Sequence, residues 1–190
     1  MTTLAPTLYT RTFPRTAGWL RDLILITLGT LFVVILAQVK IPLPFTPIPL
    51  TGQTFAVLLV GATLGPKRGI ASMVLYLALG ALGLPFFAGG AHGLKVITGA
   101  TGGYLVGFIV SAYVIGLLAE RGLERSMRTS VIPFLVGTVV IYVCGVAWLA
   151  GVLGSFGKAV TAGLVPFVVG DIVKLVAAAL ALPAAWKVTQ

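Results

Sequence analysis

Long apolar runs alternate along the whole chain with short segments rich in glycine, proline or charge. The apolar runs cover residues 23–39, 51–64, 69–84, 101–119, 131–153 and 159–186. A helix needs about 20 apolar residues to cross the hydrocarbon core of a bilayer, and most of these runs approach that length. The pattern predicts an all-α integral membrane protein with six transmembrane helices, folded as a single domain over residues 19–190.

The break between the first two runs is dominated by proline. Residues 41–50 contain Pro42, Pro44, Pro47 and Pro49. Proline lacks a backbone donor and fixes φ, so this segment is predicted to be a stiff, extended loop. Because the loop is also apolar, two interpretations stay open. It is either a plain rigid linker or a lid that closes over a binding site with Phe45, Pro47 and Pro49.

Composition supports a membrane protein. Hydrophobic residues make up 58% of the chain and charged residues 9%, whereas a soluble domain has about 25% charged residues. The single Cys144 cannot form a disulfide within the chain, so it does not indicate a redox compartment.

The net charge of +9 arises from lysines and arginines that lie mostly in alternate breaks. With six crossings, nine of the thirteen fall on the side of the termini: Arg11, Arg15, Arg21, Lys67, Arg68, Arg121, Arg125, Arg128 and Lys187. Three fall on the other side, namely Lys40, Lys95 and Lys158, and Lys174 lies inside a run. Cytoplasmic loops carry the excess of such residues, so both termini are predicted to be cytoplasmic, with residues 1–18 as a short polar tail. This bias explains the basic charge, and nucleic acid is excluded as a partner.

Two opposite charges interrupt the last apolar run. Twelve uncharged residues precede Asp171 and twelve follow Lys174, which places both charges at the centre of a predicted crossing. A charge there costs roughly 2.5–3.5 kcal/mol on insertion scales, so an intramembrane pair indicates a functional site. The spacing i, i+3 puts both side chains on one face, where they can meet each other or a common ligand. The alternative is an ion pair that only locks the helix bundle.

Several kinds of chemistry are missing from the sequence. No G-x-x-x-x-G-K-[ST] segment occurs, so the chain cannot hydrolyse ATP alone. No spacing typical of metal ligands is present, and His92 in the glycine-rich break 85–93 is expected to be a surface residue. A small membrane transferase using Asp171 as a base stays an alternative, although it lacks the expected cluster of His, Asp or Arg. We therefore predict no enzymatic activity, no metal and no cofactor.

A set of motifs, in order along residues 20–186, resembles the BioY family. They are the proline-rich 41–50 followed by Thr51-Gly52-Gln53-Thr54, Gly65-Pro66-Lys67-Arg68-Gly69, Leu82-Gly83-Leu84-Pro85, Phe87-Ala88-Gly89-Gly90, Thr101-Gly102-Gly103-Tyr104-Leu105-Val106-Gly107-Phe108 and Gly170-Asp171-x-x-Lys174. BioY proteins are the biotin-binding S components of energy-coupling factor (ECF) transporters in prokaryotic plasma membranes. The resemblance implies six helices, a biotin pocket near the outer face, and two kinds of partner: a transmembrane coupling subunit and a pair of ABC-type ATPases. An S component for another vitamin stays an alternative, and a homo-oligomer is possible.

The resemblance also implies roles for particular residues. S components dock through alanines spaced by four on the first helix, and here this pattern reads Gly29, Val33 and Ala37, an imperfect match. The Asp171 carboxylate would accept the ureido N–H groups of biotin, and Lys174 would donate to the ureido oxygen or pair with the tail carboxylate. The expected further contacts come from Gln53, from the Gly102 and Gly103 backbone, and from the rings of Tyr104 and Phe87.

Overall fold

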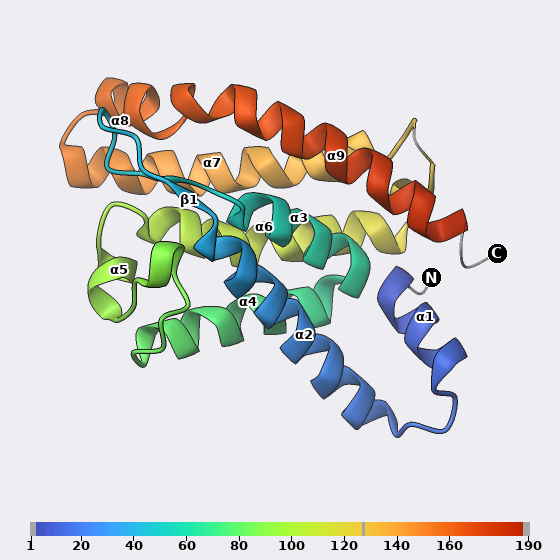
Figure 1. Ribbon diagram of the computed structural model, residues 1–190. Helices are drawn as coiled ribbons and strands as arrows, with labels where there is room; N and C mark the ends of the chain where they lie inside the picture. Colours follow the sequence, from blue (N-terminus) through green and yellow to red (C-terminus); the bar gives the residue numbers. More distant parts are fainter. Residues whose placement is uncertain (1–2, 127, 188–190) are drawn as a thin grey trace.

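The computed structural model describes residues 3–126 and 128–187, and most of these residues are helical (Figure 1). The helical elements are α1 (Leu4–Thr12), α2 (Gly18–Gln38), α3 (Gln53–Leu64), α4 (Pro66–Ala81), η1 (Ala88–Gly90), α5 (Leu94–Thr98), α6 (Gly102–Glu120), η2 (Leu123–Arg125), α7 (Val131–Leu153), α8 (Phe156–Gly163), η3 (Val165–Phe167) and α9 (Val168–Lys187). Two short strands, β1 (Lys40–Ile41) and β2 (Leu50–Thr51), pair antiparallel. The prediction of an all-α protein is confirmed.

Helix α6 lies in the middle of the bundle and packs against α3, α4 and α7. Close packing of α6 on α7 depends on glycine, because a Cβ at Gly107 would lie only 3.1 Å from the Ile141 Cα. Small residues of this kind let helix backbones approach each other in a membrane. One face of α6 is thus buried along its length, with Tyr104, Phe108 and Ile115 in the core.

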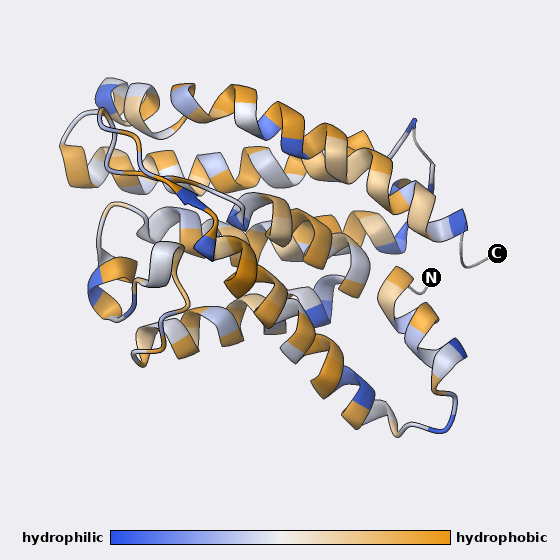
Figure 2. Cartoon of the chain, in the orientation of Figure 1, coloured by the Kyte–Doolittle hydropathy of each residue, from blue (hydrophilic) through white to orange (hydrophobic). Residues whose placement is uncertain are grey.

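Four helical segments are long and apolar enough to cross a membrane: Gly18–Gln38, Gly102–Glu120, Val131–Leu153 and Phe156–Lys187. Helices α3 and α4 have 12 and 16 residues, which is shorter than the roughly 20 needed for a perpendicular crossing. The outward sides of the long helices are apolar (Figure 2), with Ile35, Val143 and Val169 each more than 60% exposed. Such surfaces fit contact with lipid tails.

The N-terminal segment contains a helix that the sequence did not predict. Residues 4–12 form α1, which packs against α3. Leu4 is 4% exposed and lies in a core cluster with Leu58 and Ala119. The polar composition of residues 1–18 concealed this helix, because only a few apolar side chains attach it to the bundle.

The last apolar run is broken, contrary to the prediction of one uninterrupted helix. Helix α8 ends at Gly163, the turn η3 contains Pro166, and α9 begins at Val168. Asp171 therefore lies in the first turn of α9 and not in mid-helix. A helix N-terminus carries the positive end of the helix dipole, which favours a carboxylate at this position.

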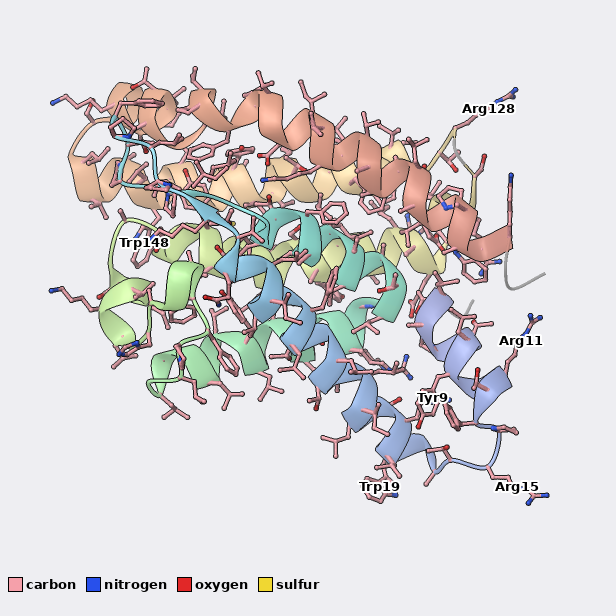
Figure 3. All side chains as sticks on the ribbon, viewed as in Figure 1. Tyr9, Arg11, Arg15, Trp19, Arg128 and Trp148 are labelled. Carbon is pink, nitrogen blue, oxygen red and sulfur yellow. The ribbon has the colours of Figure 1, made fainter. Side chains whose placement is uncertain are left out.

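The two ends of the molecule differ in character. In Figure 1 both chain ends and α1 lie at one end of the bundle, whereas the loop between β1 and β2, α5 and α8 lie at the other. Figure 3 shows Arg11, Arg15 and Arg128 at the end that holds the termini. The arrangement separates a basic end from the end where the proline-rich loop covers the helices.

Candidate binding cavity

A cavity opens beneath the proline-rich loop, between the first turns of α3, α6 and α9. Its polar lining comes from Thr51, Gln53, Thr54, Thr101, Tyr104, Tyr142, Asp171 and Lys174. Its apolar lining comes from Ile48, Pro49, Leu50, Phe87, Ala88, Val96, Leu105, Phe108, Ile141 and Phe167. The empty space is about 630 Å³ when the open mouth is counted. The cavity is therefore mostly apolar with a few polar groups gathered around Asp171, which is typical of a site for a small molecule.

The polar wall is a hydrogen-bonded network around Asp171. Lys174 Nζ lies 2.9 Å from Asp171 Oδ1 and donates also to Thr54 Oγ1 at 2.9 Å. Tyr142 donates its hydroxyl to Asp171 Oδ2. Asp171 is 8% exposed, so the ammonium, the tyrosine and the N-terminus of α9 together stabilise its buried charge.

A second group of contacts fixes the amide of Gln53, which begins α3. Gln53 Nε2 donates to Tyr76 Oη at 2.6 Å, and Gln53 Oε1 accepts from Thr51 Oγ1 at 2.9 Å. The Tyr76 ring packs edge-on against Phe87, with ring centroids 5.5 Å apart. The amide is thus held in one orientation at the cavity wall by residues from β2, α4 and the segment before η1.

Tyr104 connects the cavity to α8. Its hydroxyl donates to the Gly163 carbonyl at 2.7 Å, and its ring packs edge-on against Tyr142 at 6.4 Å between centroids. Gly163 ends α8, so this bond satisfies a carbonyl at the break that precedes α9. The ring of Tyr104 faces the cavity while its hydroxyl holds the break in place.

The BioY family model matches residues 5–190. The chain belongs to the BioY family. It is 43% identical over 161 residues to a biotin transporter BioY of Thermotoga maritima, covering 85% of this chain and 93% of that protein. It is 38% identical over 169 residues to a biotin transporter BioY of Rhizobium etli, covering 84% and 90%. A crystal structure of the S component for biotin from an ECF-type ABC transporter superposes with a TM-score of 0.82 at 26% identity, covering 90% of this chain and 95% of the other. The resemblance recognised in the sequence is confirmed.

Five of the residues predicted for the BioY ligand site line the cavity: Gln53, Phe87, Tyr104, Asp171 and Lys174. The two predicted glycines do not. A Cβ at Gly102 would collide with the Ile97 carbonyl, and one at Gly103 would collide with Trp148. Both glycines serve close packing at the start of α6, and the backbone contacts to a ligand expected of them stay a prediction.

The predicted lid residues of this BioY chain are only partly at the cavity. Pro49 lines it together with Ile48. Phe45 is 68% exposed and Pro47 is also exposed, and both lie outside the lining. The loop turns so that the residues after Pro47 face the cavity. The spacing of the prolines alone does not reveal which residues face inward.

The predicted docking residues Gly29, Val33 and Ala37 lie on the buried face of α2. Val33 and Ala37 are 0% exposed, and a Cβ at Gly29 would lie 2.7 Å from both Leu64 Cδ1 and Ser72 Oγ. This stripe packs against α3 and α4 within the chain, and its role in docking a partner subunit stays a prediction.

Sequence reasoning missed Thr54 and Tyr142, both of which contact the charged pair. Tyr142 is a hydroxyl-bearing residue inside the apolar run of α7, and Thr54 follows Gln53. Such isolated polar side chains are a signal in a membrane helix, because each needs a partner inside the bundle. His92 is exposed, which confirms the prediction of a surface residue, and its ring Nδ1 lies 3.3 Å from the Gly90 carbonyl oxygen, apart from the cavity lining.

Proposed function

We propose that this protein is the substrate-binding membrane subunit for biotin uptake. It would capture biotin in the cavity beneath the proline-rich loop and deliver it inward when coupled to an ATP-driven module. The observation that carries the proposal is the buried Asp171–Lys174 pair on a cavity wall, in a chain whose relatives are biotin transporters. A pair that only locked the bundle would not need to line a cavity.

The pair retains hydrogen-bonding capacity for a ligand. A carboxylate offers about four acceptor positions and an ammonium three donors. Lys174 uses two donors, on Asp171 and Thr54, which leaves one for the ureido oxygen or the tail carboxylate of biotin. Asp171 accepts from Lys174, from Tyr142 and, at 3.4 Å, from Thr54. A ureido N–H would take the remaining position or replace the long Thr54 contact.

The position of the proline-rich loop over the cavity supports a lid role, because Ile48 and Pro49 line the cavity. Most of the cavity wall is helical, and helices that pack closely in the bundle give way less readily than a loop does. The loop is held to α8 by one hydrogen bond between Thr46 Oγ1 and the Ala162 carbonyl, at 2.6 Å. Release of this contact would let Ile48 and Pro49 move outward to admit the vitamin, and closure would then exclude water from the polar wall.

The proposed topology has six crossings and both termini in the cytoplasm of a prokaryotic cell, with residues 19–190 as one membrane domain. The gathering of arginines at the end of the termini supports this orientation, and tilting or local thinning of the bilayer would accommodate the short α3 and α4. The cavity would then open outward. Thiol labelling of single cysteines placed at His92 and at Arg128 tests the orientation, because only the first should react with an impermeant reagent added to whole cells.

ATP hydrolysis is assigned to partners, namely a transmembrane coupling subunit and a pair of ABC-type ATPases, because the sequence contains no phosphate-binding loop. Isothermal titration with biotin, thiamine and riboflavin tests the substrate. Tight binding of biotin alone is expected. Preferential binding of another vitamin would leave the S-component architecture in place but show that biotin is not the substrate. Turnover of a lipid substrate would favour a transferase that uses Asp171.

A further inference from the structure

A second pocket lies at the opposite end of the molecule from the biotin cavity, and the two share no lining residue. It is formed where α1 crosses the ends of α2, α4 and α6. Arg11, Arg21 and Arg68 line it, together with threonines of α1 and Glu120. Its empty space is about 790 Å³ when the open mouth is counted, compared with about 630 Å³ in the biotin cavity. This arginine pocket is therefore roomy and polar.

Asp22 holds two of the arginines together. Arg68 places both Nε and Nη2 at 2.8 Å from Asp22 Oδ1, and Arg21 Nε lies 3.2 Å from the same oxygen. Two guanidinium groups on one carboxylate oxygen leave a net positive charge. Each guanidinium has five N–H donors, so each retains donors beyond those that Asp22 accepts. The result is a pair of pre-oriented forks, the geometry that suits the oxygens of a phosphate group.

The side chains around the pocket are of the kinds that occur at the level of lipid headgroups. Trp19 is 71% exposed and Phe13 57% exposed on the segments that flank it, and Figure 3 shows Trp19, Tyr9 and Arg15 together at this end. Aromatic side chains gather at the level of the headgroups, and basic residues beside them attract anionic lipids. Helix α1 supplies one wall of the pocket, so a bound headgroup would tie α1 to α2 and α4.

We propose that the arginine pocket binds the phosphate group of an anionic phospholipid headgroup. The negative charge of Glu120 would repel such an anion. The three positive charges of the arginines exceed the two negative charges of Glu120 and Asp22, so the pocket keeps a net positive charge. The acyl chains would lie along the exposed apolar side of α2, where Leu23 is 54% exposed. Free phosphate offers the same chemistry without the chains, and the test separates the two sources.

Native mass spectrometry of the full chain in detergent, with added phosphatidylglycerol or phosphatidylcholine, measures the proposed binding. Preferential retention of phosphatidylglycerol is expected. One arginine contact with an anionic lipid corresponds to about fivefold in affinity, so Arg68→Gln should lower retention about fivefold. Arg128→Gln is the matched control, because Arg128 is exposed on a different loop of the same end and lies outside the pocket. This variant should retain the lipid as the unaltered chain does.

Glu120→Gln keeps the proposal testable if Arg68→Gln destabilises the fold, because it removes the opposing charge and should raise retention of phosphatidylglycerol. If millimolar inorganic phosphate displaces the lipid, the pocket recognises the phosphate group and also accepts it from a soluble source. Failure of phosphate to displace it would support the lipid. Equal retention of both lipids, or equal losses in Arg68→Gln and Arg128→Gln, would overturn the proposal.

Discussion

Replacement of Asp171 by asparagine is the sharpest test of the proposed biotin site. The change keeps the size of the side chain but replaces one acceptor oxygen by an NH₂ donor and removes the charge. A hydrogen bond to a charged group contributes about 1.5–3 kcal/mol. Loss of one such bond to the ureido group should therefore weaken biotin binding roughly 10-fold to 150-fold.

The same substitution also disturbs the protein without ligand. Lys174 loses its counter-charge, and its side chain is only 19% exposed. Breaking a buried pair by removing one partner costs up to about 3–5 kcal/mol, and the partial exposure of Lys174 reduces this figure. A lower thermal midpoint is therefore expected alongside the weaker binding, and the two effects need separate measurement.

Isothermal titration in detergent gives the affinity, and thermal unfolding without ligand gives the stability. Tyr142→Phe is the matched control, because it removes one hydrogen bond to Asp171 Oδ2 and leaves both charges in place. It should weaken binding less than Asp171→Asn does. A folded Asp171→Asn protein that binds biotin with unchanged affinity would refute the role of the carboxylate.

Three further outcomes are expected. Lys174→Gln should weaken the binding of biotin and of biotin methyl ester equally if Lys174 contacts the ureido oxygen, but the binding of biotin alone if Lys174 contacts the tail carboxylate. Isothermal titration with both ligands distinguishes the two, and unchanged affinity for both ligands would contradict either role. Thr46→Val removes the bond to the Ala162 carbonyl, so stopped-flow mixing should show faster biotin association and dissociation, whereas unchanged rates would argue against a lid. Burial raises the pKa of Glu124 above its ordinary 4.5, so folding binds a proton and stability falls as the pH rises through the raised pKa. Glu124→Gln should therefore raise the thermal midpoint at pH 7 relative to the unaltered chain, and the two midpoints should converge near pH 4. A difference in midpoint that does not depend on pH would contradict a raised pKa of Glu124.

The sequence predicted the helical class, most long helices and five cavity residues, because apolar runs and intramembrane charges report directly on the bilayer. It did not predict the break before α9. Hydropathy is the same whether an apolar run forms one helix or two, and the Tyr104 hydrogen bond to the Gly163 carbonyl at the break joins residues 59 positions apart, which no local pattern reveals. The position of Asp171 at a helix start followed only from the structure.

The small-residue stripe on α2 shows a different limit. A repeat of small residues every four positions predicts that something packs closely there, but it does not distinguish a neighbour in the same chain from another subunit. Here the neighbours are Leu64 and Ser72. Tyr142 was missed for a related reason, because the face of α7 that meets α9 is set by tertiary packing.

The pairing of β1 with β2 bears on how tightly a small ligand can be held. Two antiparallel residue pairs, Lys40 with Thr51 and Ile41 with Leu50, join the ends of residues 42–49. Four prolines restrict the backbone angles of this loop. A segment so tethered has little conformational entropy left to lose when a ligand orders it. The proline-rich loop is in this sense preorganised, so most of the contact energy between a ligand and the protein can appear as affinity.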